Sequence, residues 1–419
     1  MTGILDFCAK CFVGCGFAFA MVGPYSSAHA SGGETVLHSF CSRSDCRDGA
    51  APQGGVIVDS SGNLYGTTWY GGAKGGGNVF EITPDGTYNV LHSFCSRSNC
   101  ADGEDPLAGL IMDSSGNLYG TTTSGGANGS GTVFRLAPNG TETVLYNFCS
   151  RRHCSDGAGP STGVVMDGSG NLYGTTINGG RSCRCGSVFR LAANGTETTL
   201  YSFTAGSDGY EPNSVILDSE GNLYGTTPFG GVNGAGNVFE VSPDHSFKLL
   251  YSFCSQPNCS DGASPSAGPI MDDSGNLYGT ALYGGKYSYG TVFKLAANGS
   301  ETTLYNFCSR GDCRDGAYPA ADLTMDASGN LYGTTQFGVG RDCYDRNPSQ
   351  CGTVFKLAPN GTETALYSFC SKAGCADGLT PAGSLIMDVS GNLYGTTFQG
   401  GRGHCIDGCG AVFRLDPGR

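Results

Sequence analysis

One heptapeptide, Gly-Asn-Leu-Tyr-Gly-Thr-Thr, recurs along the 419-residue chain and constrains its fold more than any other feature. The seven copies begin at Gly62, Gly116, Gly170, Gly221, Gly275, Gly329 and Gly391. The one departure is Ala281, which replaces the last threonine of the fifth copy. The intervals of 54, 54, 51, 54, 54 and 62 residues are too long for ankyrin or tetratricopeptide helices and are close to the period of a propeller blade. A repeat that runs almost end to end predicts one domain, although the length alone would suggest more.

Each unit is expected to form four short β-strands, because Leu, Tyr and Thr favour a pleated, half-buried surface and Gly-Asn pairs mark turns. In the first complete unit, the predicted strands are Gly55–Asp59, Asn63–Thr68, Asn78–Ile82 and Tyr88–Phe94. Tight turns follow the first and third strands, and longer loops follow the second and fourth.

The two ends of the chain predict that the repeat closes into a ring. Residues Glu34–Phe40 read as a fourth strand with no unit before it, and the last unit stops after its third strand, Ala411–Leu415. The sequence therefore predicts an all-β, seven-bladed propeller over residues 31–419, with four-stranded antiparallel blades and the N-terminal strand completing the last blade. A linear β-solenoid is the alternative, which the period disfavours because solenoid coils are usually shorter than ~30 residues.

Residues 1–30 are predicted to be a signal peptide. Lys10 precedes the apolar run 11–23, and Ala28-His29-Ala30 matches an A-x-A cleavage signal. We therefore expect a secreted or extracytoplasmic protein, in the periplasm or at the cell surface. No later segment approaches the ~20 apolar residues of a membrane span. The net charge of −13 argues against nucleic acid as a partner.

The cysteines are expected to form disulfides, in keeping with export. Six C-x4-C pairs occupy the same loop of six units: Cys41/Cys46, Cys95/Cys100, Cys149/Cys154, Cys254/Cys259, Cys308/Cys313 and Cys370/Cys375. The fourth unit lacks both cysteines together and its loop is shorter, as expected if two thiols act as one bond. A metal site is the disfavoured alternative, because each loop supplies only two thiolates and no histidine recurs beside them.

Three further pairs of cysteines lie in the loops that follow the second strands. Cys343 and Cys351 bracket an insertion in the sixth unit, and Cys405 and Cys409 are similarly placed in the seventh. Both pairs are predicted disulfides. Cys183 and Cys185 have no sequence-based explanation, because a C-x-C bridge is strained and a two-thiol metal site is incomplete.

Departures from the repeat collect on one predicted face of the ring. If the first strand of each unit lies nearest the axis, alternation places the tight turns on one face and the cysteine loops and post-threonine loops on the other. The second face carries aromatic and arginine side chains, a composition typical of a recognition surface. The candidate ligand-binding residues are Trp69, Tyr70, Phe229, Tyr283, Phe337, Phe398, Arg43, Arg97, Arg151 and Arg310. The alternative is that these rings only pack between blades.

The repeated polar residues are interpreted as structural. The aspartate of each D-x-S-G-N turn, Asp59 in the first unit, suggests calcium, but one carboxylate per turn is too few and an Asx-type turn explains it better. The aspartate after each cysteine loop is likewise interpreted as loop structure. Four Asn-Gly-Thr/Ser sequences match glycosylation acceptors, but Asn-Gly between strands is also a hairpin signal. They begin at Asn139, Asn194, Asn298 and Asn360.

A catalytic site would need residues that break the repeat, because seven equivalent groups cannot form one active site. His38 and His92 replace a tyrosine of the fourth strand and are interpreted as surface substitutes, and the other histidines share no spacing. No G-x-S-x-G, H-E-x-x-H or P-loop motif occurs. We therefore predict no catalytic residue, no metal and no cofactor.

The repeated G-N-L-Y-G-T-T, with the following G-x-V-F-x-L and P-N-G-T-E, resembles the GloVer tandem repeat of exported bacterial proteins. The resemblance covers nearly the whole chain after residue 30 and implies an exported propeller, but it assigns no activity. Members carry varied C-terminal anchors, and none is visible after Leu415. The V-x-D-x-x-G-N-x-Y pattern is more distantly similar to streptogramin lyases, whose catalytic histidine motif finds no match here.

Three functions are consistent with these observations. The leading hypothesis is a secreted, non-catalytic binding or scaffold protein, a monomer that recognises an extracellular glycan or protein through the variable face. A propeller enzyme, of lyase, lactonase or hydrolase type, with its site in the central channel is the second. A structural protein of the cell surface or matrix is the third.

Overall fold

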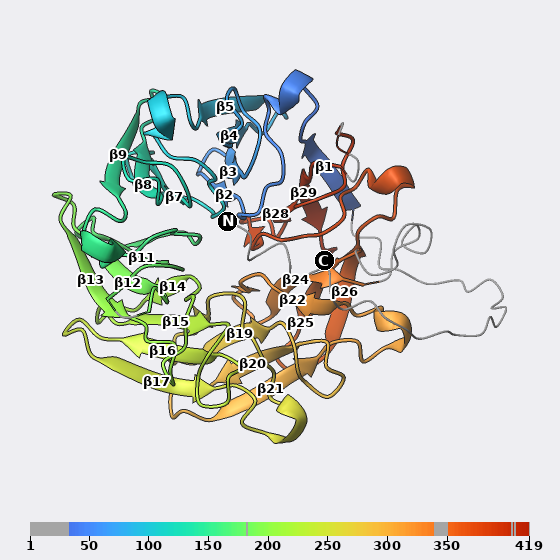
Figure 1. Ribbon diagram of the computed structural model, residues 1–419. Helices are drawn as coiled ribbons and strands as arrows, with labels where there is room; N and C mark the ends of the chain where they lie inside the picture. The colour runs from blue at the N-terminus through green and yellow to red at the C-terminus, as the bar shows by residue number, and fades with distance from the viewer. Residues whose placement is uncertain (1–32, 182, 339–350, 404, 406–407, 419) are drawn as a thin grey trace, which may run out of the picture. The chain divides into compact units, whose positions relative to one another are not determined.

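The computed structural model describes residues 33–181, 183–338, 351–403, 405 and 408–418. Within these residues, seven antiparallel sheets surround a central axis as the blades of a propeller (Figure 1). This confirms the predicted fold class. The signal peptide predicted for residues 1–30 lies outside the described residues and stays a prediction.

The first strand of each blade is short and lies nearest the axis. These inner strands are β2 (Ile57–Val58), β6 (Ile111–Met112), β10 (Val165–Met166), β14 (Val215–Leu217), β18 (Ile270–Met271), β23 (Thr324–Met325) and β27 (Ile386–Met387). The second strands carry the heptapeptide: β3 (Leu64–Thr68), β7 (Leu118–Thr122), β11 (Leu172–Thr176), β15 (Leu223–Thr227), β19 (Leu277–Ala281), β24 (Leu331–Phe337) and β28 (Leu393–Thr397).

The third and fourth strands complete each sheet outward from the axis. The third strands are β4 (Asn78–Ile82), β8 (Thr132–Leu136), β12 (Ser187–Leu191), β16 (Asn237–Val241), β20 (Thr291–Leu295), β25 (Thr353–Leu357) and β29 (Ala411–Asp416). The outer strands are β1 (Gly33–Ser39), β5 (Tyr88–Ser93), β9 (Glu142–Asn147), β13 (Glu197–Ser202), β17 (Phe247–Ser252), β21 (Glu301–Asn306) and β26 (Glu363–Ser368). The sixth blade adds β22 (Ala317–Pro319), which pairs with β24.

The N-terminal strand closes the ring, as predicted. β1 pairs antiparallel with β29 from Gly33 opposite Asp416 to Ser39 opposite Ala411. The blue and red strands therefore lie side by side in Figure 1, although they are separated by nearly the whole chain. The seventh blade is thus built from both ends of the propeller sequence.

The heptapeptide recurs because each of its positions has a packing role. A Cβ atom on Gly66 would lie 2.6 Å from the ring of Phe80, which is fully buried, so a larger residue does not fit there. Thr67 Oγ1 donates to the carbonyl oxygen of Ala108 in the next blade at 2.8 Å. The repeat therefore encodes both the core of a blade and its attachment to the following one.

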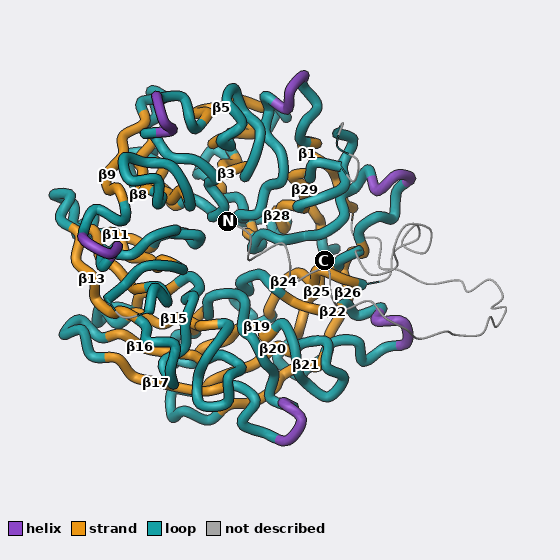
Figure 2. Tube along the Cα trace, in the orientation of Figure 1, coloured by secondary structure: helices purple, strands orange, loops and turns teal. Residues whose placement is uncertain are grey.

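The cysteine loops contain one-turn 3-10 helices at the outer edge of the ring (Figure 2). These are η1 (Ser44–Cys46), η2 (Ser98–Cys100), η3 (Arg152–Cys154), η4 (Pro257–Cys259), η5 (Gly311–Cys313) and η6 (Ala373–Cys375). Each cysteine loop is joined by backbone hydrogen bonds to the next post-threonine loop, as from Gly72 N to Cys46 O at 2.9 Å and from Ala50 N to Tyr70 O at 2.9 Å. We call the side that carries these two kinds of loop the loop face, and the side that carries the tight turns the turn face.

Candidate recognition face and central channel

Aromatic side chains of the post-threonine loops gather on the loop face in three groups. Trp69 stacks on Tyr70, with 4.1 Å between ring centroids, and also contacts Phe398 of the preceding blade. Phe229 stacks on Tyr210 at 5.2 Å. The third group surrounds Tyr318, whose ring lies 5.2 to 5.6 Å from three others. These three are Tyr283, Tyr289 and Phe337.

The candidate rings divide into exposed and half-buried members. Tyr70, Phe229 and Tyr283 are 44%, 41% and 49% exposed, whereas Trp69, Phe337 and Phe398 are half-buried. The half-buried rings pack within or between blades, as the alternative interpretation holds. The exposed rings leave one side open to solvent, which gives this face rigid, apolar contact surfaces.

Two carboxylates stand beside these rings, each directly before the proline in the segment that leads to an inner strand. Asp105 and Glu211 occupy this position in blades 2 and 4, where the backbone has φ of 61° and 55°. Burial raises the pKa of Asp105, a shift that hydrogen bonds from Ser124 and Trp69 oppose. Burial also raises the pKa of Glu104 and of Glu211. Acceptor groups and aromatic rings therefore share the loop face.

The four candidate arginines lie at the joints between blades. Arg97 Nη2 lies 2.7 Å from Glu142 Oε2, at the start of the next outer strand. The same contact joins Arg151 to Glu197 at 2.8 Å and Arg310 to Glu363 at 2.9 Å. Each of these guanidinium groups is about half exposed while its carboxylate is buried. The arginines thus link neighbouring blades and still present part of their surface to solvent.

At the remaining joints between blades, the arginine or the glutamate is replaced by a different residue. Lys372 pairs with Glu34 of β1 at 2.5 Å and so links the sixth blade to the closing strand. Arg43 meets Tyr88 instead of a glutamate, and its guanidinium lies 5.6 Å from the centroid of that ring. In the fifth blade Gln256 faces Glu301, and burial raises the pKa of Glu301 to about 7. Among the described residues, this joint therefore pairs a half-buried acid with a neutral side chain instead of a cation.

His38 and His92 are not the surface substitutes that the sequence suggested. Each ring is 13% exposed, and its Nε2 lies 3.2 Å from Asp48 Oδ2 and 3.3 Å from Asp102 Oδ2, respectively. In other units a tyrosine hydroxyl takes this place, as Tyr146 does when it donates to Asp156 at 2.8 Å. A histidine or a tyrosine at this position of the outer strand therefore contacts the buried aspartate of the cysteine loop. The histidine Nε2 and the tyrosine hydroxyl lie at similar distances from the carboxylate.

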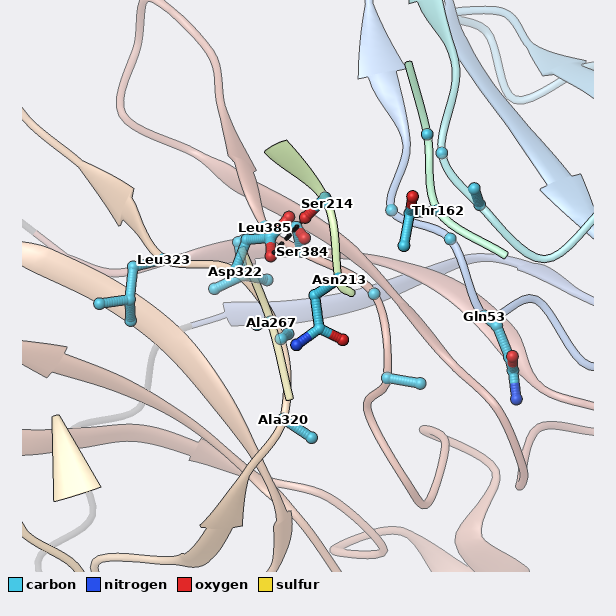
Figure 3. Close-up of a pocket in the computed structure, with 18 of the residues that line it drawn as sticks. Gln53, Thr162, Asn213, Ser214, Ala267, Ala320, Asp322, Leu323, Ser384 and Leu385 are labelled. Carbon is cyan, nitrogen blue, oxygen red and sulfur yellow. Dashed lines mark hydrogen bonds between the residues drawn. The ribbon is translucent and has the colours of Figure 1, made fainter. Parts of the chain in front are cut away.

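A cavity of about 680 Å³ occupies the central channel and is lined by residues of all seven blades (Figure 3). Leu282, from a post-threonine loop, and Gln336, near the end of β24, also line it, so the channel continues towards the loop face. Most of the lining is aliphatic or glycine. Among the lining residues that the structure describes, Asp322 is the only titratable side chain.

Asp322 breaks the repeat at the innermost position of the ring. The residue four positions before the aspartate of the first tight turn is glycine in four blades, serine in two and aspartate in one; these are Gly55, Gly109, Gly163, Ser214, Gly268, Asp322 and Ser384. Asp322 Oδ1 accepts from Gly268 N at 2.7 Å and from Ser214 Oγ at 3.4 Å, and Ser384 lies beside it (Figure 3). Burial raises the pKa of Asp322, and these hydrogen bonds oppose the shift.

The predicted disulfides are confirmed for the described residues. All six C-x4-C pairs are bridged, and Cys405 is bridged to Cys409. Cys343 lies outside the described residues, so its predicted pairing with Cys351 stays a prediction. Cys183 is bridged to Cys185.

The structure explains where the Cys183–Cys185 bridge lies. Cys185 packs in one cluster with Phe203, and Cys183 Sγ lies 3.5 Å from Phe203 O. Phe203 begins the one loop that lacks the C-x4-C pair. The bridge therefore stands beside the loop from which the usual disulfide is missing.

These features define a closed seven-bladed propeller with one uniform and one variable face. The profile of the family described as the Gloeobacter/Verrucomicrobia repeat matches residues 24–214, 151–345 and 216–419. The chain belongs to this family, which confirms the resemblance found in the sequence. No curated protein matches the chain in sequence.

Solved structures with the same fold differ widely in sequence and in what they do. PorZ, a surface component of the type-IX secretion system of Porphyromonas gingivalis, has a TM-score of 0.53 and 13% identity, with 86% of this chain and 46% of PorZ covered. A fungal alcohol oxidase in complex with copper gives 0.55 and 14%, with 92% and 76% covered. A puromycin hydrolase gives 0.55 and 11%, with 84% and 50% covered. At such identities the likeness shows the fold alone.

The described part of the chain holds no helix long and apolar enough to cross a membrane.

Proposed function

We propose that the chain is an extracytoplasmic, non-catalytic propeller that binds an extracellular glycan or protein through the loop face. The observation that carries this proposal is the exposure of Tyr70, Phe229 and Tyr283 at one repeated position of three blades. Large rings with this much exposed surface leave apolar area in contact with water, so their concentration on one face favours a binding role.

The chemistry of this face suits a glycan in particular. The C–H faces of a sugar ring pack against aromatic rings, and its hydroxyl groups donate to carboxylates. Glu104, Asp105 and Glu211 supply such acceptors on the same side. Multiple disulfides and the likeness to PorZ, a bacterial surface component, support an extracytoplasmic location.

The test is to probe glycan and protein arrays with the purified chain and then to measure affinity for each ligand found. Replacing Tyr70, Phe229 and Tyr283 together by alanine should weaken binding by at least roughly 30-fold, because an aromatic anchor is worth about 2 kcal/mol. Val389→Ala is the matched control, since Val389 is fully exposed on the turn face. Unchanged binding of every ligand by the triple variant would contradict the proposal.

An enzyme with its site in the channel is the second candidate, and Asp322 is the observation that favours it. A carboxyl group that lines a cavity and has a raised pKa is suited to general acid or base chemistry. If a small-molecule activity is found, Asp322→Asn should abolish it, whereas Ser266→Ala, elsewhere in the same lining, should not. An activity that survives Asp322→Asn would exclude this candidate.

A further inference from the structure

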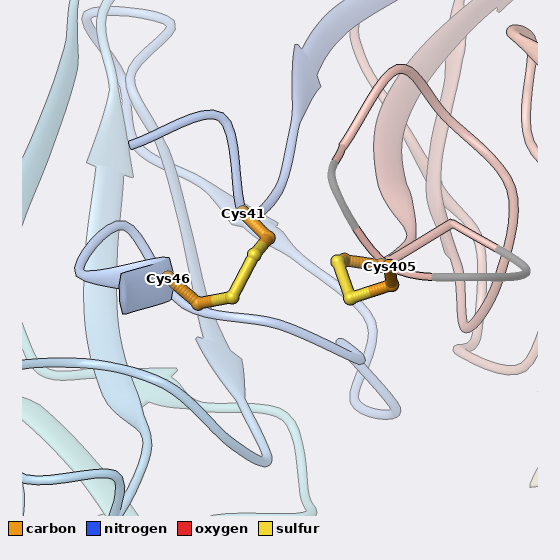
Figure 4. A group of neighbouring side chains, drawn as sticks. Cys41, Cys46 and Cys405 are labelled. Atoms are coloured by element: carbon orange, nitrogen blue, oxygen red, sulfur yellow. A yellow bond between two sulfur atoms is a disulfide. The ribbon is translucent and has the colours of Figure 1, made fainter. Parts of the chain in front are cut away.

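Two disulfides lie side by side where the ring closes (Figure 4). Cys41–Cys46 follows β1, and Cys405–Cys409 lies in the loop between β28 and β29 of the same blade. The four Sγ atoms all lie within 4.8 Å of one another. Among the described residues, no other set brings four cysteine sulfurs together in this way.

The fold itself, rather than either bridge, brings the two pairs together. Cys409 precedes the glycine that leads into the third strand, the position that Gly76 holds in the first blade. A Cβ atom on Gly76 would lie 2.8 Å from Cβ of Cys95, the first cysteine of the neighbouring loop. A cysteine at this position therefore lies against the cysteine loop. The sixth blade repeats the arrangement, because Cys351 packs in one cluster with Cys370 and Cys375.

The four sulfur atoms match the donor set of a tetrahedral metal site. In the structure these four sulfurs form two disulfides, so they become metal ligands only when both bridges are reduced; Zn–S bonds of about 2.3 Å would then place the four thiolate sulfurs about 3.8 Å apart, a separation below the 4.8 Å that bounds them here. Cys41 and Cys409 are buried, whereas Cys405 is exposed and provides a route for an ion to enter. Four convergent thiols are complete as a ligand set, unlike the two thiols of an isolated C-x4-C loop.

We propose that, before its two bridges form, the newly made chain binds one zinc-type divalent ion through Cys41, Cys46, Cys405 and Cys409. Binding converts four thiols into four thiolates and releases four protons, so no electrons are exchanged. The ion connects loops that are far apart in the chain, which neither disulfide does, because their cysteines are separated by 5 and 4 residues. It would therefore hold the two ends of the propeller sequence together before oxidation.

The test uses the full chain, reduced and kept free of oxygen, and titrated first with Co²⁺ and then with Zn²⁺. We expect thiolate-to-cobalt charge-transfer absorption and tetrahedral d–d bands. Cys405→Ser with Cys409→Ser should lose one tightly bound ion per chain. The matched control is Cys308→Ser with Cys313→Ser, which removes the equivalent loop bridge of a blade that has Tyr289 at the position of Cys409. This control should lose no bound ion.

A second variant separates a metal ligand from half of a disulfide. Cys405→His keeps a zinc ligand at an exposed position but cannot form the bridge, so it should still bind the ion and should shift the cobalt d–d bands to shorter wavelength. The proposal is overturned if the reduced chain shows no charge-transfer band. It is also overturned if the Cys405/Cys409 double variant binds as many ions as the control. Neither result bears on ligand binding by the loop face, which is measured on the oxidised protein.

Discussion

The turn face and the loop face hold their backbones in different ways. On the turn face, Asp59 accepts from the backbone of Ser61 and Asn63, from the Asn63 side chain and from the Tyr65 hydroxyl, all within one blade. On the loop face, backbone groups join each post-threonine loop to a cysteine loop, as between Ala50 and Tyr70, and a buried aspartate side chain such as Asp48 supports the cysteine loop itself. Side chains support the turns, whereas main-chain bonds support the post-threonine loops.

This difference explains why one face is uniform and the other varies. A turn whose side chains hydrogen-bond to one another tolerates few substitutions. The oxygen atoms of its aspartate already accept hydrogen bonds within the turn, so they are poorly placed to bind a ligand. This supports the Asx-turn interpretation over calcium. A loop held by its main chain leaves the side chain at the position of Tyr70 free to change, and Ser124 and Asn178 occupy that position in blades 2 and 3. Side chains at this position of the loop face can therefore change without loss of the fold.

The largest effect that we predict contrasts the two kinds of aspartate in the third blade. Asp156 is fully buried in its cysteine loop and accepts from Tyr146 and from the backbone and hydroxyl of Ser150, each at 2.8 Å. Asp156→Ala should lower the free energy of unfolding by about 3 kcal/mol, because buried donors lose a charged acceptor. Asp167→Ala, in an exposed turn, should cost about 1 kcal/mol. Urea denaturation measures both.

The pH dependence of this pair provides a control. Burial opposes the shift, but the hydrogen bonds win and hold the pKa of Asp156 below its ordinary value of 3.8. Its stabilising contribution is therefore present above pH 3.8 and is lost as the pH falls through the lower value in the folded protein. The difference between wild type and Asp156→Ala should shrink in acid. Equal costs for the two aspartate variants at neutral pH would contradict the distinction between the buried aspartate of the loop face and the more exposed aspartate of the turn face.

A loop disulfide should contribute less than the buried aspartate does. Cys308→Ser with Cys313→Ser should lower the free energy of unfolding by about 2 kcal/mol, the value expected for a bridge that closes so short a loop. The loop at Thr204 supports this order, because Asp208 still accepts from the Thr204 backbone at 2.7 Å where no cysteines are present. The prediction is wrong if the double cysteine variant loses more free energy of unfolding than Asp156→Ala does.

The joint of the fifth blade offers a predicted gain in stability. In the folded protein the pKa of Glu301 is about 7, above its ordinary value of 4.5. The contribution of the protonated side chain to the free energy of unfolding is therefore fully present below pH 4.5 and is lost as the pH rises through 7. Gln256→Arg should recover about 1 kcal/mol at pH 8, because it supplies the cation found at the other joints, and less at pH 5. Thermal denaturation at both pH values measures this gain, and an equal effect at the two would contradict it.

The smallest effect is predicted for the exposed rings. Tyr283→Ala should change the free energy of unfolding by no more than about 0.5 kcal/mol, as for most surface substitutions. Val389→Ala on the turn face should do the same, whereas only the first should weaken ligand binding. A large loss of stability in Tyr283→Ala would show that this ring serves the fold.

The blades, their order and the closing strand could be predicted from the sequence, because a strand signal that is weak in one unit recurs at the same place in the others. The first strand was overestimated: Gly55–Asp59 was predicted and β2 covers Ile57–Val58. Gly55 lies against the Ser384 carbonyl near the axis, so its surroundings are set by another blade. Short inner strands depend on such neighbours rather than on propensity.

The candidate site was predicted less completely. Asp322 carries a visible signal, since it replaces glycine or serine at one repeat position, but only the structure shows that this position lines the channel. The pairing of Arg97 with Glu142 joins residues of two units, and it depends on blade twist bringing the end of one outer strand to the start of the next. The partner of a repeated residue is often in the next repeat, which periodicity alone does not reveal.

The ring of blades is complete only when β1 pairs with β29. A ribosome that releases the polypeptide early, before β29, leaves β1 with an unsatisfied backbone edge and β28 without its neighbour. Blades 1 to 6 are each built from consecutive strands, whereas this last pairing joins the two ends of the propeller sequence and bears the largest loop-closure entropy. The ring therefore closes only in a chain that extends through β29.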